Sequence, residues 1–151
     1  MKKVLMGAVA LSLVGLTMSA QAQFARPDDA IKYRQSALFV MGQNFGRVAA
    51  MAAGKVPFDA KVAAESAAVA EFMSKLPWPA YVAGSDKVSG TRAKPEIWTE
   101  AAKFQETAEK LQAEMAKFSA AAKTGSLDNI KATLGGVGST CKSCHDQFRR
   151  D

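Results

Sequence analysis

Histidine and cysteine are almost absent from this sequence, whose 151 residues include one histidine and two cysteines. A structural zinc site takes four protein ligands, which these three side chains cannot supply. A single histidine also excludes a site in which one chain holds a metal between two imidazoles. The spacing of these three residues therefore decides which chemistry is open to them.

Three other features are missing. No segment alternates apolar and polar residues for long enough to predict a strand, and alanine is abundant, so the sequence predicts an all-α fold. Lysines and arginines do not cluster with interleaved aromatic residues, which argues against nucleic-acid binding. The apolar stretch at residues 4–16 is shorter than the ~20 residues that a membrane-spanning helix needs, so no membrane anchor is predicted.

The three rare residues lie together in the motif Cys141-Lys142-Ser143-Cys144-His145. The C-x-x-C-H pattern predicts covalent attachment of a c-type haem. On a helix, Cys141 and Cys144 share a face, so both thiols can reach the vinyl groups along one porphyrin edge. The His145 imidazole can then bind the haem iron.

Two other uses of the cysteines need consideration. A thiol–disulfide enzyme using Cys141 and Cys144 belongs near a strand–helix turn in a βαβ setting, which this sequence does not predict. A structural disulfide between them would strain a regular helix. Haem attachment is the favoured interpretation.

Residues 1–22 are typical of a signal peptide. Lys2 and Lys3 precede the apolar stretch, and Ala20-Gln21-Ala22 is a small-x-small cleavage site. Cleavage would leave residues 23–151 as one domain and lower the formal charge from +6 to +4, which suits solubility and weak contacts with acidic partners. Export agrees with the haem motif, so we predict a periplasmic protein.

Four segments have helical periodicity: residues 27–53, 57–75, 95–124 and 126–149, with a loop at 77–94 between the second and third. In the last two, apolar residues recur three and four apart, with one gap of seven in the third. This is the spacing of helices that cross at about 20° in a bundle. The positions are Trp98, Ala101, Ala108, Leu111, Met115, Phe118 and Ala122, then Leu127, Ile130, Leu134, Val137, Cys141, Cys144 and Phe148.

Both cysteines lie on this apolar stripe, so the haem should enter the core of an antiparallel four-helix bundle. Gly135, Gly136 and Gly138 precede them, at a cost of ~1 kcal/mol each relative to alanine in a helix. Two interpretations stay open. A side chain there would collide with the haem or a facing helix, or the helix breaks and restarts near Ser139.

The second axial ligand of the iron is a separate question. Met41, Met51, Met73 and Met115 remain after signal removal, and Met41 is the most plausible ligand because it follows Leu38 on the first helix. Methionine is more often a filler of irregular core space than a ligand.

Several motifs along the mature chain resemble the cytochrome c′ family of class II c-type cytochromes. They are Gln23-Phe24-Ala25-Arg26-Pro27, Tyr33-Arg34-Gln35-Ser36-Ala37-Leu38, Phe45-Gly46-Arg47, Leu76-Pro77-Trp78, Lys94-Pro95-Glu96-Ile97-Trp98 and Cys141-Lys142-Ser143-Cys144-His145-Asp146.

The resemblance implies a homodimeric periplasmic bundle, paired through its first two helices, with one five-coordinate, high-spin haem c per chain. Leu38 would close the distal face of the haem, while Arg34 and Gln35 would contact the haem and its propionates. Arg92 would supply a contact from the loop before the third helix. Arg149 would lie on the proximal side.

A leucine above the iron offers neither a hydrogen bond nor a lone pair. We therefore expect binding of NO and CO with little affinity for O₂, with or without electron transfer to a redox partner. The alternative is a low-spin, methionine-ligated electron carrier of the same fold. Catalysis is not expected, because the sequence has no second histidine to act as a distal acid or base.

Overall fold

The computed structural model describes residues 24–150, so the predicted signal peptide, residues 1–22, lies outside the described residues. The regular secondary structure of the described part is helical apart from one isolated bridge between Ala93 and Arg149. The elements are α1 (Pro27–Ala52), α2 (Ala60–Met73), a short 3₁₀ helix η1 (Trp78–Ala80), α3 (Glu96–Thr99), α4 (Ala101–Lys123) and α5 (Leu127–Phe148).

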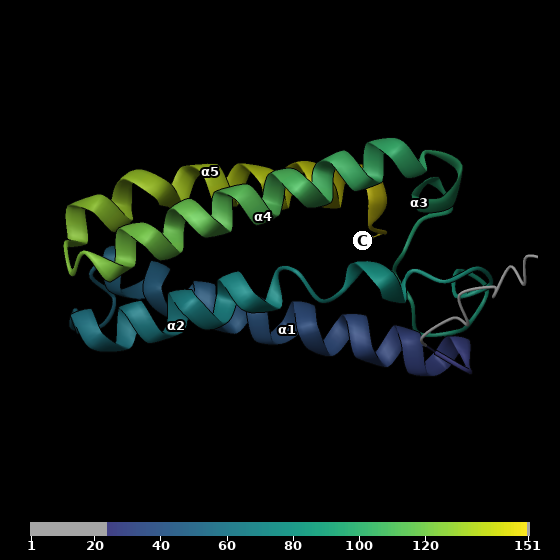
Figure 1. Ribbon diagram of the computed structural model, residues 1–151, viewed down its shortest axis with the longest axis horizontal. Coiled ribbons are helices and arrows are strands. Elements are labelled where there is room, and N and C mark those ends of the chain that lie inside the picture. The colour runs from purple at the N-terminus through teal and green to yellow at the C-terminus, as the bar shows by residue number, and fades with distance from the viewer. Residues whose placement is uncertain (1–23, 151) are drawn as a thin grey trace, which may run out of the picture.

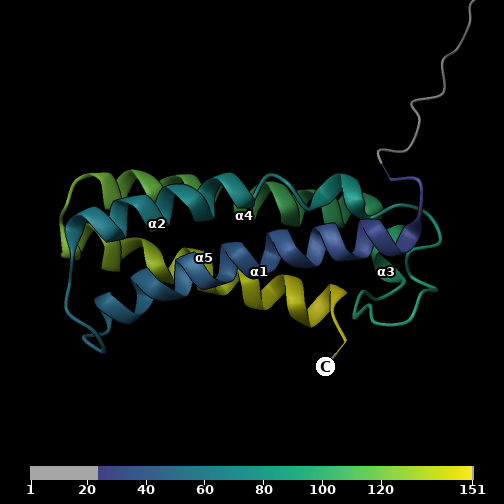
Figure 2. The same cartoon turned by 90° about the horizontal axis from the view of Figure 1, so that it is seen from below.

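The four long helices form an antiparallel bundle. In Figure 1, α4 and α5 form one layer and α1 and α2 the other, with α3 and the loop before it at one end. Contacts are dense between α1 and α2, α2 and α4, and α4 and α5, and much sparser between α1 and α5. Figure 2 shows α1 and α5 crossing on the same side of the bundle. The predicted all-α four-helix bundle is confirmed, and its loosest seam lies between the first and last helices.

Local sequence sets the helix ends. Pro27 starts α1 and is followed by two acidic residues in the first turn, where the helix dipole favours negative charge. Ser126 is the N-cap of α5, because its hydroxyl accepts a hydrogen bond of 3.3 Å from the backbone N–H of Asn129. Gly125 has φ +71° just after α4, a conformation that glycine adopts without strain.

The predicted third helix is not continuous. The helix is interrupted at Glu100, which separates the single turn of α3 from α4. The buried stripe of α4 therefore starts at Phe104, which fills the predicted gap of seven, whereas Ala101 is exposed and Trp98 only half-buried. The prediction was wrong here because it carried one helical phase across two helices.

Of the two interpretations of the glycines in α5, a break near Ser139 is excluded, since α5 runs unbroken from Leu127 to Phe148. A Cβ built at Gly136 would meet the carboxylate at the flexible end of the Glu114 side chain on α4. At Gly135 and Gly138 a Cβ would meet no protein atom within 4 Å. Within the protein, a facing helix therefore limits space at one glycine of the three, and there only through a side chain that can move.

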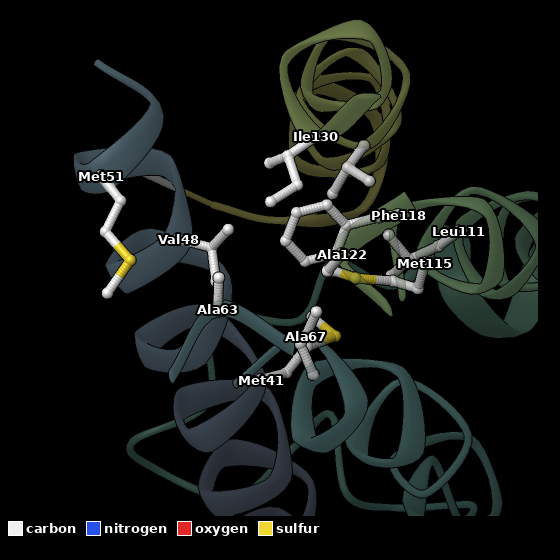
Figure 3. Close-up of a cluster of buried hydrophobic side chains, with 12 residues drawn as sticks. Met41, Val48, Met51, Ala63, Ala67, Leu111, Met115, Phe118, Ala122 and Ile130 are labelled. Atoms are coloured by element: carbon white, nitrogen blue, oxygen red, sulfur yellow. The ribbon is translucent and has the colours of Figure 1, made fainter. Parts of the chain in front are cut away.

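Two clusters of buried side chains form the core. The larger one lies between the four long helices and includes Met41, Val48, Met115, Phe118 and Ile130 (Figure 3). The smaller one lies at the α3 end and consists of Ala93, Ile97, Phe104 and Phe148. No helix in the described range combines the length and the apolar character that crossing a bilayer requires.

Candidate haem site

Cys141 and Cys144 lie on the inward stripe of α5, and each is half-buried. Cys141 packs against the larger core cluster and Cys144 against the smaller one. The two thiols therefore lie where the clusters meet, beside the sparsely packed seam between α1 and α5.

A cavity of about 420 Å³ opens at this place, within the range of small-molecule and cofactor sites. Its walls come from α1, α4, α5, η1 and the loop between η1 and α4. All eight residues that the sequence suggested for the site line it: Arg34, Gln35, Leu38, Arg92, Cys141, Cys144, His145 and Arg149.

Several further lining residues were not singled out by sequence reasoning. Trp78, Tyr81, Phe104 and Phe148 form a connected aromatic group, with ring centroids between 4.8 and 6.4 Å apart. Phe148 was predicted to face the core, but Tyr81 lies in a loop without periodicity, and no sequence signal marks it. The aromatic group gives the cavity one largely apolar wall.

Arg34 is 2% exposed and holds the loop that closes the cavity. Its guanidinium donates to the Ala80 carbonyl at 3.0 Å, to the Ser85 hydroxyl at 2.7 Å and carbonyl at 3.4 Å, and to the Thr91 hydroxyl at 2.8 Å. It also lies over the Tyr81 ring, 4.4 Å from the centroid. Among the described residues no carboxylate pairs with this buried charge, and burial lowers the pKa of Arg34.

Gln35, the next residue on α1, ties the same loop from the exposed side. Its amide nitrogen donates to the Gly90 carbonyl at 2.9 Å. Gly90 has φ +87°, so the loop turns there in a conformation suited to glycine. Thr91 and Arg92 follow directly and line the cavity, so α1 fixes the position of this part of its wall.

Proteins that are similar to this chain in sequence and in structure point to one family. The sequence model of the family described as Cytochrome C' matches residues 29–149. The cytochrome c′ of Rubrivivax gelatinosus is 54% identical over 127 residues, which are 84% of this chain and 98% of the relative. A crystal structure of cytochrome c′ from Rubrivivax gelatinosus matches with a TM-score of 0.81 at 53% identity, covering 85% of this chain and 100% of that one. The nitric oxide complex of a leucine-to-alanine mutant of cytochrome c prime from Alcaligenes xylosoxidans matches with a TM-score of 0.78 at 42% identity, covering 85% and 99%.

The chain belongs to the cytochrome c′ family. It therefore carries haem c, bound covalently through Cys141 and Cys144, and the geometry suits that cofactor. The two thiols share one helix face beside a cavity with apolar walls, and the buried charge of Arg34 at its edge has no acidic partner in the described chain.

The environment of the thiols is unlike that of a redox enzyme. Burial is the main cause that raises the pKa of Cys141 and raises the pKa of Cys144 to about 11. A reactive cysteine needs a lowered pKa, because the thiolate is the nucleophile. The cytochrome c′ assignment and the thiol environment together argue against the thiol–disulfide interpretation.

His145 is placed to act as a ligand in its neutral form. Burial and the nearby charge of Arg149 lower its pKa, and Asp146 opposes them weakly. A lowered pKa keeps the imidazole neutral near pH 7, with a lone pair available for a metal. In residues 24–150 no group of three or more His, Cys, Asp or Glu side chains is arranged to hold a metal ion by itself.

The methionines occupy different places. Met41 lines the cavity, whereas Met51 and Met115 are buried in the larger cluster away from the cavity lining, and Met73 packs at the edge of that cluster. Of the four methionines considered as a second axial ligand of the cytochrome c′ iron, Met41 is the one that lines the cofactor cavity. Its side chain also packs in the larger cluster, as Figure 3 shows.

A second hollow, of about 430 Å³, lies beside the haem cavity and is lined by Lys94, His145, Asp146, Arg149 and Arg150. His145 and Arg149 line both hollows, so they separate them. The haem cavity has mainly apolar walls, whereas every residue around the second hollow is polar or charged.

Proposed function

We propose that this member of the cytochrome c′ family is a periplasmic protein whose haem is five-coordinate and binds NO and CO, with or without electron transfer to a redox partner. The observation that supports the proposal is that His145 and Leu38 line one cavity from two different helices, α5 and α1. His145 would hold the iron, and the bound haem would supply a site for a diatomic gas.

Leu38 is the proposed distal residue. Its half-buried side chain has no atom that can bind iron or donate a hydrogen bond, so water and O₂ gain nothing from it. NO and CO bind ferrous haem without such a donor. Two leucine mutants of the cytochrome c prime of Alcaligenes xylosoxidans, which is similar in structure, form nitric oxide complexes, and this supports the same ligand here.

Charged and polar lining residues have proposed roles at the haem edge. The positive charge of Arg34 would attract a propionate, although the hydrogen bonds of its terminal nitrogens are directed to the loop. Gln35 and Arg92 lie at the same edge, and exposed Arg149 would lie on the side of His145. The described lining contains no carboxylate and no second histidine, so no distal acid–base catalyst of the peroxidase kind is proposed.

Export and dimer formation belong to the same proposal. The features of residues 1–22 support export to the periplasm. Phe39 on α1 and Phe72 on α2 are 66% and 60% exposed, and Val69 is 38% exposed. Large apolar side chains that are this exposed favour an interface with a second copy of the chain.

A low-spin electron carrier is the second candidate, because Met41 lines the cavity. The optical and resonance Raman spectra of the ferric protein at neutral pH separate the two. A high-spin spectrum is expected. A low-spin spectrum that changes to high-spin in Met41→Leu would establish the second candidate instead.

The distal role of Leu38 is tested by CO binding. Leu38→Ala should speed CO association by about tenfold or more, which is about 1.4 kcal/mol of the barrier. Leu134→Ala is the matched control, since Leu134 is also a half-buried leucine but does not line the cavity. Equal rates in the two variants would show that Leu38 does not control access to the iron.

A further inference from the structure

Two segments far apart in the sequence are joined beside the haem cavity. The backbone nitrogen of Lys94 donates to the Phe148 carbonyl at 3.0 Å, and that of Arg150 donates to the Arg92 carbonyl at 2.8 Å. The Lys94 ammonium adds a 2.9 Å bond to the Asp146 carbonyl. These bonds hold residues 92–94 against the end of α5.

This junction concentrates positive charge. Residues 24–150 contain 18 basic and 13 acidic side chains, a formal charge of +5. Segments 92–94 and 142–150 hold five of the basic residues and one of the acidic ones, so four of the five net charges lie there. We call this the basic surface; its cations are Arg92, Lys94, Lys142, Arg149 and Arg150.

Ion pairs between residues 24 and 150 neutralise little of this charge. Within that range one ion pair joins the basic surface to an acid, Lys142 to Asp146 at 2.6 Å, at side chains that are 77% and 59% exposed. The Lys94 and Arg150 side chains donate to backbone carbonyls, which carry no net charge. Among residues 24–150 no carboxylate forms an ion pair with the other four cations, and three of these four are exposed.

The basic surface adjoins the cofactor site. Arg92 and Arg149 line the haem cavity, and Lys94, Arg149 and Arg150 line the polar hollow. A protein seated on this surface would therefore be separated from the haem cavity mainly by His145 and Arg149. This position suits electron transfer from a docked protein better than entry of a gas, because a neutral gas molecule gains nothing from surface charge.

We propose that the basic surface is the docking site of an acidic redox protein. Complementary charge raises association rates by about 10- to 1,000-fold at low salt. In the step that docking serves, one electron passes from the reduced cofactor of the partner to the ferric iron, which becomes ferrous, and no bond forms or breaks. The inference rests on the proposed haem function and adds to it the class of partner and its point of contact.

The test measures haem reduction by two electron donors in stopped flow. Photoreduced flavodoxin, an acidic flavoprotein, is the partner probe, and reduced lumiflavin, a small flavin without a phosphate, is the reference. Lys142→Glu should slow reduction by flavodoxin about tenfold at 10 mM salt and leave the lumiflavin rate unchanged. The difference should shrink at 150 mM salt, because the Debye length falls from about 30 to about 8 Å.

Lys131→Glu is the matched control. Lys131 is also exposed on α5, and its replacement changes the net charge by the same amount. It lies 11 residues, or about 16 Å, from Lys142 towards the other end of the helix. Equal slowing in both variants, or slowing in neither, would overturn the docking site. Flavodoxin rates that do not distinguish the two variants would refute the docking site alone, because the proposed haem site is tested separately by its spectra and by CO binding.

A binding readout avoids electron transfer altogether. Amide NMR spectra of the labelled protein, titrated with oxidised flavodoxin, should show salt-reversible shifts confined to residues 92–94 and 142–150. Shifts centred on exposed α1 and α2 would contradict the proposal.

Discussion

The hydrogen bonds of Arg34 hold the loop before α3 in place through one side chain. The variant Arg34→Met should show how much these bonds contribute to the stability of the protein. The variant keeps an unbranched apolar chain but removes the donors to Ala80, Ser85 and Thr91. Hydrogen bonds to a charged group contribute about 1.5–3 kcal/mol each, and the cost of burying the guanidinium offsets part of that sum. We expect the free energy of unfolding to fall by about 3 kcal/mol.

Urea unfolding of the haem-loaded protein measures the effect. With a slope near 2 kcal/mol/M, the midpoint should fall by about 1.5 M. Hydrogen exchange should also accelerate in residues 80–93, since their anchor is lost. Arg34→Lys should be intermediate, because an ammonium keeps the charge but cannot reproduce the planar set of donors.

Arg47→Met is the matched control. Arg47 is also on α1, but it is exposed and makes a single hydrogen bond of 3.3 Å, to Ser66. Its replacement should change the free energy of unfolding by less than about 0.5 kcal/mol. If the two methionine variants lose the same stability, the buried guanidinium does not anchor the loop.

Three other predictions concern stability. Gly135→Ala should raise the free energy of unfolding, measured in thermal melts, by about 0.5–1 kcal/mol. Gly135 is helical and exposed, and the protein leaves space there for a methyl group. No gain would mean that the bound haem occupies that space. Ser126→Ala should lower the free energy of unfolding by about 1 kcal/mol through loss of the N-cap of α5, whereas Ser139→Ala, in the middle of that helix, should not. Burial raises the pKa of Tyr81 to about 12, despite the opposing charge of Arg34. Because the folded state favours the neutral phenol, its contribution is complete below pH 10 and is lost as the pH rises towards 12, so wild type should lose about 2 kcal/mol more than Tyr81→Phe over that interval in denaturant titrations.

The bundle could be predicted because its helices follow local rules. The stripe of α5 has the same spacing in sequence and structure, and Ser126 and Gly125 are recognisable caps. The break at Glu100 could not be predicted, since neither glycine nor proline marks it. The glycines of α5 left a helix break open from the sequence, and the helix continues because packing of its apolar face outweighs a cost of about 1 kcal/mol per glycine.

The site was predictable to a different extent. The C-x-x-C-H motif identified the attachment, and the resemblance led to residues that the fold brings to one cavity. The environment of Arg34 was not predictable, because its partners lie 46 to 57 residues away in a loop without periodicity. An arginine is rarely buried without a paired acid, so nothing in the sequence suggested that backbone carbonyls and hydroxyls would hold it.

The position of the two cysteines has a consequence for biogenesis. Cys141 belongs to the larger apolar cluster and Cys144 to the smaller, so a chain awaiting its porphyrin has a gap of about 420 Å³ where these clusters meet. Such a polypeptide should be loosened first at the end that carries α3 and the arginine-anchored loop. Proteases would then meet a substrate whose vulnerability disappears once both thioether bonds have formed, so maturation and resistance to degradation would be acquired in one event.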